Sequence, residues 1–247
     1  MRNVNNISIT YLQNRTESWL NILEKTPFVE RLLTRFVYFI DGCISEELLD
    51  RLKCHSERVA KYAVLLGKEL QLPKEFNNRL FKGGLFHDIG KIGIPTKILF
   101  KKTNLSTQEF EIIKNHPLIG AEILNKSLIL QEAIPAVLFH HERFNGSGYP
   151  YGFSNKYIPL EAQIIGLVDC FDALTTERSY HNALPYHIAL QILEEQTKEG
   201  QWDSKLFFVF KQMINKMASL SSLDNSYMEE NPVFLFKKKL NKADELN

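Results

Sequence analysis

Glycine and proline, which interrupt helices more often than other residues, are concentrated in one part of this chain. The 247 residues include 12 glycines and 9 prolines, and a dense group lies at Gly146, Gly148, Pro150, Gly152 and Pro159. Elsewhere, apolar residues recur at steps of three, four or seven, the period of an α-helix, and no strand-like alternation is long enough to predict a sheet. We therefore predict an all-α fold with one glycine-rich loop.

The helical period also predicts where the longest helices lie. Pro73 is expected to end the first of them, and the second opens with Ser106 and Glu109 in the spacing of a capping box. Phe110 is expected on the buried face of that second helix. The expected helices cover residues 47–72, 105–125, 161–176 and 186–198.

The chain divides into three parts by composition. We expect an N-terminal helical appendage of unassigned role over residues 1–45 and a main domain over residues 46–220. The charged segment 221–247 is expected to be a polar tail or a terminal helix.

Composition excludes several classes of protein. A net charge of +1 argues against a nucleic-acid-binding footprint spread over the whole surface and leaves a local basic patch open. Cys43, Cys54 and Cys170 show no paired spacing, which fits a reducing compartment and argues against a cysteine-based zinc site. The N-terminus lacks the apolar core of a signal peptide, and no apolar run approaches the ~20 residues of a membrane span. We therefore expect a cytoplasmic protein that binds neither nucleic acid nor membrane.

The histidines carry the strongest chemical signal. His55 follows Leu52 by three residues and precedes Val59 by four, which places it on a buried stripe. One buried histidine is usually a satisfied core residue. The set here is larger and is hard to pair by hydrogen bonds alone: His55, His87, His116, His140 and His141, with the carboxylates Asp88 and Asp169.

A shared metal centre satisfies all of these groups at once. Histidine and aspartate ligands without a thiolate favour iron or manganese and leave zinc open. A carboxylate such as Asp88 can bridge two ions ~3.5–4 Å apart, the spacing used for in-line displacement at phosphorus. Asp172, one helical turn after Asp169, is expected to support the site without binding metal.

At these residues the chain resembles the HD-GYP family of phosphodiesterases, a branch of the HD phosphohydrolase superfamily. The matching blocks begin at His55 (HSERVA), His87 (HDIGKIGIP), Lys114 (KNHP), His140 (HHERFNGSGYP) and Asp169 (DCFDALTTER). The resemblance implies a helical bundle with a metal centre in its core. It also implies hydrolysis of cyclic di-GMP, with a mixed AMP and GMP ring as the substrate of some members.

The resemblance assigns roles residue by residue. The implied metal ligands are His55, His87, Asp88, His116, His140, His141 and Asp169. Asp88 and Lys91 would serve catalysis, in which hydroxide activated by two cations attacks phosphorus. The substrate contacts would be Lys91, Tyr149 and Arg178, with Gly148 and Pro150 shaping the loop.

Two departures and two alternatives follow from the same comparison. Family members with a third metal carry a glutamate where this chain has Arg51, so we expect two metals and a linear dinucleotide product. The family commonly has aspartate in place of Asn145, arginine in place of Gln163, and a ligand-binding basic residue in place of His181. These changes keep open the alternative of a weakly catalytic cyclic dinucleotide receptor. Another HD-type phosphohydrolase is the second alternative. A homodimer, and a diguanylate cyclase or sensor protein, are the candidate partners.

Overall fold

The computed structural model describes residues 46–101, 103–177 and 183–223, with the backbone alone described at 46–54 and 220–223. The expected appendage over 1–45 and nearly all of the C-terminal segment lie outside these residues, as do Arg178 and His181. The side chain of Arg51 lies outside them too. The division of the chain into three parts therefore stays a prediction.

The all-α prediction is confirmed, since no strand occurs among the described residues and the one β-bridge, between Asn145 and Ser154, is isolated. The longer helices are α3 (Glu46–Glu69), α4 (Lys74–Phe86), α7 (His116–Leu124), α9 (Leu160–Thr175), α10 (Tyr186–Lys198) and α11 (Ser204–Leu223). The shorter ones are α5 (Thr96–Leu99), α6 (Thr107–Ile113), α8 (Ile134–Phe139) and the 3-10 turns η1 (Ile89–Gly93), η2 (Gln131–Ala133) and η3 (Asn155–Tyr157).

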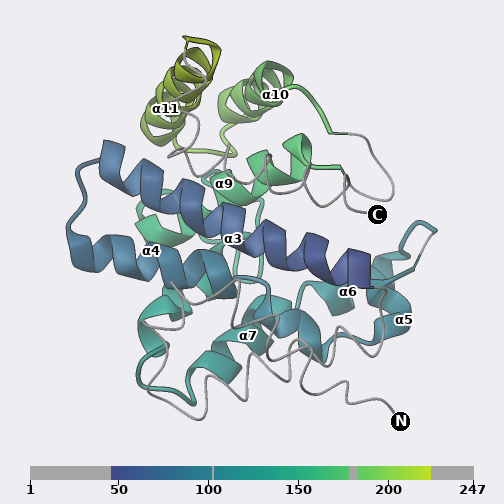
Figure 1. Ribbon diagram of the computed structural model, residues 1–247. Coiled ribbons are helices and arrows are strands. Elements are labelled where there is room, and N and C mark those ends of the chain that lie inside the picture. The colour runs from purple at the N-terminus through teal and green to yellow at the C-terminus, as the bar shows by residue number, and fades with distance from the viewer. Residues whose placement is uncertain (1–45, 102, 178–182, 224–247) are drawn as a thin grey trace, which may run out of the picture.

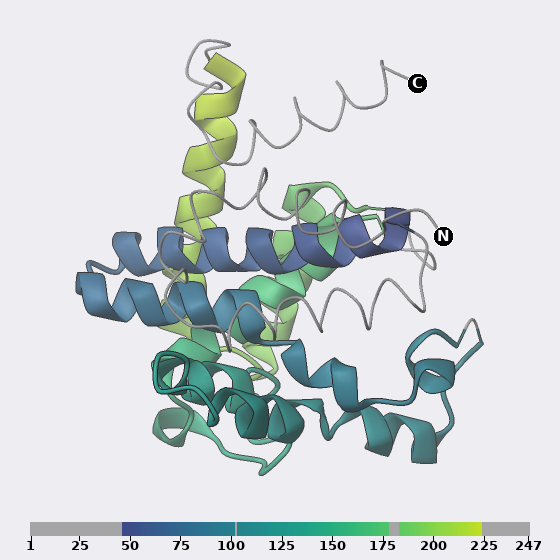
Figure 2. The same cartoon turned by 60° about the horizontal axis from the view of Figure 1, so that its bottom comes forward.

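Helices α3 and α4 run side by side as a hairpin and form the middle layer of the bundle (Figure 1). Helix α9 contacts both of them, with α10 and α11 packed beyond it. Helix α8 contacts both α4 and α9, and α7 packs against α8, while α5 and α6 extend beyond the bundle (Figure 2). The larger hydrophobic core lies among α3, α4, α9, α10 and α11, and a smaller one lies around α7, α8 and η2.

Close backbone contacts at two glycines hold the layers together. A Cβ on Gly84 of α4 would lie 2.5 Å from the Cα of Ala60 on α3, so glycine allows the two helices to approach. A Cβ on Gly90 in η1 would lie 1.8 Å from the carbonyl oxygen of His116. This second contact brings the segment that follows α4 against the start of α7.

Two of the expected helices differ from the structure. The helix expected over 105–125 is interrupted: α6 ends at Ile113 and α7 begins at His116, because Pro117 has no N–H for the Ile113 carbonyl. The Ser106–Glu109 capping box is confirmed, but Phe110 is 44% exposed and does not lie on a buried face. The first helix ends at Glu69, earlier than expected, and α4 was not predicted as a separate helix.

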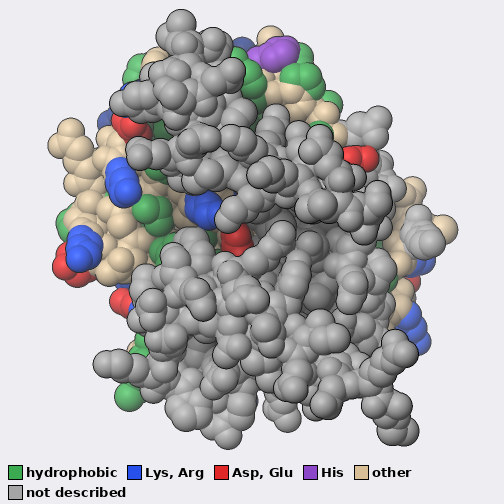
Figure 3. Space-filling model, viewed as in Figure 1, with side chains coloured by type: hydrophobic (Ala, Val, Ile, Leu, Met, Phe, Trp, Pro, Cys, Tyr) green, Lys and Arg blue, Asp and Glu red, His purple; other side chains and the backbone are tan. Residues whose placement is uncertain are grey.

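Two observations concern the apolar length of the helices and the charge on the surface. No helix within the described ranges is both long and apolar enough to cross a membrane. On the part of the face described in Figure 3, basic and acidic side chains are interspersed and do not form a patch of one sign.

Candidate metal centre

Five elements of the bundle bring the expected ligands to one place. His55 lies in the middle of α3, His116 opens α7, and Asp169 lies in α9. The two adjacent pairs each follow the last residue of a helix: His87 and Asp88 after α4, His140 and His141 after α8. Four of the five histidines are buried, His141 is half-buried, and His55 is 8% exposed as its helical stripe predicted.

The ligand atoms form two groups that share one carboxylate. Within each group all ligand atoms lie within 4.8 Å of one another, and the groups are His55, His87 and Asp88, and Asp88, His116, His140 and His141. The Oδ2 atom of Asp88 lies 3.4 Å from His87 Nε2, whereas its Oδ1 lies 3.4 Å from His116 Nε2. Asp88 therefore presents one oxygen to each group, as a bridging carboxylate does.

Asp169 adjoins the first of these groups. Its Oδ1 lies 3.3 Å from His55 Nε2 and 3.8 Å from His87 Nε2. The sequence-predicted ligands therefore all meet in one cluster.

Three of the histidines are oriented by the helix end that they adjoin. The Nδ1 atoms of His87, His116 and His140 lie 2.8 Å from the carbonyl oxygens of Gly84, Ile113 and Val137, each three residues earlier. Because a carbonyl can only accept, each Nδ1 carries the proton and donates. Each Nε2 is then left with a free lone pair directed into the cluster.

His55 is oriented by a carboxylate instead. Its Nδ1 lies 2.7 Å from Asp172 Oδ2, and Arg58 donates to the same carboxylate at 2.5 and 2.9 Å. Asp172 is almost fully buried and does not reach the cluster itself. Its position matches the supporting role expected from the sequence, whereas Arg58, one turn after His55 on the same helix, was not assigned a role.

Burial keeps several imidazoles in the form that binds metal. It lowers the pKa of His116 to about 4, and burial together with the nearby His116 lowers the pKa of His141 to about 3. Burial also holds the pKa of His140 well below its ordinary value. These three side chains are therefore neutral at pH 7, as ligands must be.

The carboxylates of the cluster are ionised. Burial would raise the pKa of Asp88, but the neighbouring Lys91 ammonium outweighs it and holds that pKa well below the ordinary range. Burial would likewise raise the pKa of Asp169, but the hydrogen bond from His55 outweighs it and holds that pKa well below the ordinary range.

His55 differs from the other imidazoles. Although burial would lower the pKa of His55, its bonds to Asp169 and Asp172 raise it to about 9.

The residues present fit a divalent metal. His87 Nε2 is fully buried and has no hydrogen-bond partner among the described residues, which is costly for a polar atom unless something else binds it. A ligand set of imidazole nitrogens and carboxylate oxygens suits first-row divalent metals. The cluster can therefore hold divalent metal.

The glycine-rich loop folds back onto this cluster. The Tyr149 ring stacks on His141 with centroids 4.6 Å apart, and the Tyr149 N–H donates to the His141 carbonyl at 3.2 Å. A Cβ on Gly148 would lie 2.4 Å from the Cα of Glu142, so the loop backbone approaches closely. Glu142 accepts from the Tyr151 N–H at 2.8 Å, beyond Pro150. Glu142 thus anchors the loop, a role that the sequence did not reveal.

Lys91 also reaches the cluster, where its Nζ donates to Asp88 Oδ2 at 2.5 Å. It lies in η1, three residues after Asp88, and its side chain is 31% exposed. Lys91 is therefore placed between the ligands and the surface.

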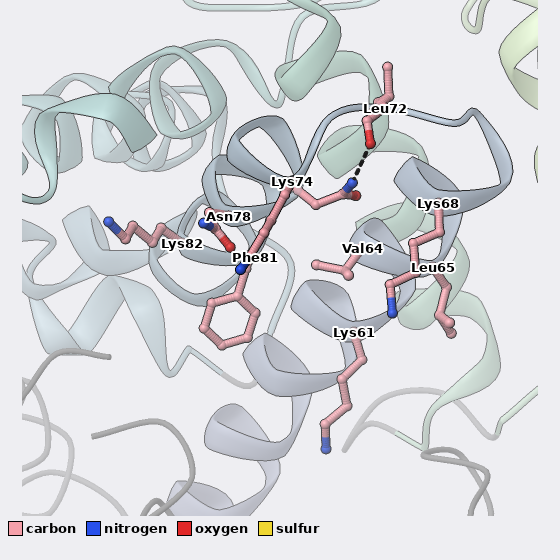
Figure 4. Close-up of a pocket in the computed structure, with 10 residues that line it drawn as sticks. Lys61, Val64, Leu65, Lys68, Leu72, Lys74, Asn78, Phe81 and Lys82 are labelled. Carbon is pink, nitrogen blue, oxygen red and sulfur yellow. Dashed lines mark hydrogen bonds between the residues drawn. The ribbon is translucent and has the colours of Figure 1, made fainter. Parts of the chain in front are cut away.

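A separate groove of about 610 Å³ lies between α3 and α4 (Figure 4). Its lining includes the apolar side chains Val64 and Phe81. It also includes the basic residues Lys61 and Lys68 of α3 and Lys74 and Lys82 of α4. None of its described lining residues belongs to either ligand group.

Comparisons with known proteins agree with this geometry. A cyclic di-GMP phosphodiesterase of Thermotoga maritima is 37% identical over 185 residues, which cover 71% of this chain and 49% of that protein. A 3'3'-cGAMP-specific phosphodiesterase of Vibrio cholerae is 35% identical over 161 residues, covering 65% of this chain and 35% of that protein. The chain thus spans half or less of the length of these curated relatives.

Solved structures share the fold. An HDG"Y"P protein from Bdellovibrio bacteriovorus superposes with a TM-score of 0.53 at 20% identity, over 66% of this chain and 52% of that one. The HD domain of the phosphodiesterase PgpH from L. monocytogenes, in complex with cyclic-di-AMP, gives a TM-score of 0.53 at 20% identity, over 79% of this chain and 97% of that one. The family model described as HD domain matches residues 43–206. This chain therefore belongs to the HD domain family.

Proposed function

We propose that this protein is a metal-dependent phosphodiesterase that hydrolyses cyclic di-GMP to the linear dinucleotide. The observation that carries the proposal is the shared carboxylate, because Asp88 presents one oxygen to each of two histidine groups. Two divalent cations, when bound, activate water as a nucleophile and neutralise charge on the phosphate oxygens. We propose iron or manganese as the metal, given nitrogen and oxygen ligands without a thiolate.

The proposed ligands are those of the cluster. His55, His87 and Asp169 would hold one ion, His116, His140 and His141 the other, and Asp88 both. The backbone carbonyls and Asp172 keep the imidazoles in position, so little rearrangement is needed for binding.

Residues of this chain on the edge of the cluster would bind the substrate. The Lys91 ammonium donates to Asp88 and can donate to a phosphate oxygen of the substrate instead. Asp88 and Lys91 would therefore both serve catalysis. Tyr149 offers a ring and a hydroxyl, on a loop whose shape depends on Gly148 and Pro150. Arg178 is proposed as a further phosphate or guanine contact from its motif alone.

The substrate class rests on the relatives, which are named for cyclic di-GMP and for 3'3'-cGAMP. Arg51 stands where a third metal would need a carboxylate, and this supports two ions and a linear product. A preference for the mixed ring and a weakly catalytic receptor are the second candidates. We further propose a cytoplasmic location, and a homodimer or a diguanylate cyclase or sensor partner as its assembly.

Metal and product analysis on the full chain tests the proposal. Protein loaded with manganese or iron should retain two ions per chain and convert cyclic di-GMP to the linear dinucleotide. His87→Ala and Asp88→Ala should lose both metal and turnover, whereas His187→Ala, an exposed histidine of α10, should keep both. Full turnover in either ligand variant, or none in the loaded wild type, would overturn the proposed activity. Three tightly bound ions per chain would overturn the two-metal assignment.

A further inference from the structure

Helix α6 lies beside α5 at one end of the molecule and carries an unusual surface (Figure 1). None of its residues is buried, and two of its large hydrophobic side chains face solvent: Phe110 is 44% exposed and Ile112 is 39% exposed. Both ends of the helix are nonetheless fixed. The Ser106–Glu109 capping box holds its start, and Asn115 donates to the Glu111 carbonyl at 2.9 Å near its end. An exposed aromatic ring is thus held at a defined position without a core contact to explain it.

That ring continues a series of rings that starts at the metal ligands. Tyr149 stacks on His141, and Phe110 contacts Tyr149 edge-on with centroids 6.4 Å apart. The Nζ of Lys114 lies 5.0 Å from the Phe110 centroid and 5.9 Å from the Tyr149 centroid. The Phe110 ring and the Lys114 ammonium therefore both lie beside the Tyr149 ring.

Lys114 is held there by a contact that a ligand can replace. Its Nζ donates to Glu111 Oε1 at 2.7 Å, and the Glu111 side chain is 60% exposed. Exposed ion pairs between neighbours on one helix are weak. The ammonium can therefore turn to a ligand lying on the rings at little cost.

We propose that Phe110 and Lys114 form a base-binding subsite that favours guanine over adenine. Phe110 provides the stacking surface that any base accepts. Lys114 donates to the O6 and N7 acceptors of guanine, whereas adenine presents an amino donor in place of O6. The proposal rests on the proposed function, because it places the base of a cyclic dinucleotide whose phosphate lies at the metal centre.

Binding of hydrolysis-resistant phosphorothioate analogues of cyclic di-GMP and cyclic di-AMP to the manganese-loaded full chain tests this subsite. The wild type should bind the guanine analogue about tenfold more tightly, the discrimination typical of one good contact to a base edge. Lys114→Met should abolish that ratio, and Lys114→Arg should retain it, because arginine also donates to O6 and N7. Phe110→Leu should weaken both analogues about tenfold and leave the ratio unchanged.

Lys126→Met is the matched control, since Lys126 is exposed just after α7, and it should bind as the wild type does. The subsite is refuted if the Lys114 and Phe110 variants bind like the wild type, if Lys114→Met weakens both analogues equally, or if the wild type binds neither. A wild type that shows the expected binding pattern but no turnover would refute the phosphodiesterase and keep the subsite. Turnover of cyclic di-GMP by the wild type, with analogue binding unchanged in the Lys114 and Phe110 variants, would refute the subsite and keep the phosphodiesterase.

Discussion

Replacing Asp172 by asparagine tests whether metal binding depends on how the His55 ring is oriented, because His55 itself stays in the chain. Asp172 accepts from His55 Nδ1 at 2.7 Å and from Arg58 at 2.5 and 2.9 Å, and it is 1% exposed. Asparagine has nearly the same shape, but it keeps a single acceptor oxygen and no charge. The change therefore leaves every proposed metal ligand in the chain while it weakens the support of one of them.

The magnitude follows from these contacts. Loss of a group that orients a ligand typically costs 10- to 100-fold in metal affinity, which corresponds to roughly 1.4–2.7 kcal/mol. Arg58, whose side chain is 18% exposed, also loses the charged partner of two hydrogen bonds. We expect the free energy of unfolding of the metal-free protein to fall by roughly 2–3 kcal/mol as a result.

Titration calorimetry of the metal-free full chain with manganese, together with urea unfolding, measures both effects. The group that contains His55 should lose affinity, while the group that contains His116 should keep its own. Asp203→Asn is the control. Asp203 accepts from the Leu206 N–H at 2.8 Å at the start of α11, far in the chain from any proposed ligand. Asparagine can accept the same bond, so neither metal affinity nor the free energy of unfolding should change by much. Metal affinity of Asp172→Asn within twofold of the wild type would refute the orienting role.

Four further changes test other parts of the structure. Gly90→Ala should lower the free energy of unfolding by roughly 1–3 kcal/mol and reduce metal content, because its Cβ would collide with the His116 carbonyl; melting and metal analysis measure this. Phe171→Ala should cost roughly 3–5 kcal/mol in urea unfolding, since Phe171 packs in the larger core. Ser106→Ala should cost about 1 kcal/mol and speed amide exchange in α6. Chelation of manganese held at 100 times its dissociation constant should remove about 2.7 kcal/mol of stability and lower the melting temperature.

The sequence predicted helices well where one apolar stripe runs without a break. The helices expected over 161–176 and 186–198 correspond to α9 and α10 within one residue at each end. The same reasoning placed His55 among buried side chains, and it is buried. In these segments the local period and the tertiary packing favour the same face, so periodicity alone is sufficient.

Where tertiary packing overrides the local pattern, the helices could not be predicted from periodicity alone. In helix α4, Lys82 interrupts the apolar stripe and Gly83 and Gly84 lower the helix propensity, yet all three are buried in the bundle. Gly84 is needed for the close approach to α3, a requirement that only the packed structure reveals. The exposure of Phe110 likewise depends on the break before α7, which turns α6 away from the core.

The sequence predicted which side chains would meet, but it could not predict that the two oxygens of Asp88 face different histidine groups. Each of its oxygens faces a different group because η1 lies against the start of α7, and that contact depends on Gly90 meeting the His116 carbonyl. These segments are separated by more than one helix in the chain. Sequence spacing carries no information about which carboxylate oxygen faces which imidazole.

The helix ends explain how three of these buried histidines are held in a fixed orientation. The last carbonyls of a helix lack an intrahelical donor, and a buried carbonyl without one is costly. At α4, α6 and α8 the imidazole that follows the helix supplies that donor through Nδ1. One hydrogen bond therefore caps the helix and fixes the tautomer that presents Nε2 to a metal. Helix termination and ligand orientation are the same interaction, so a change that extends any of these helices should also disturb the centre.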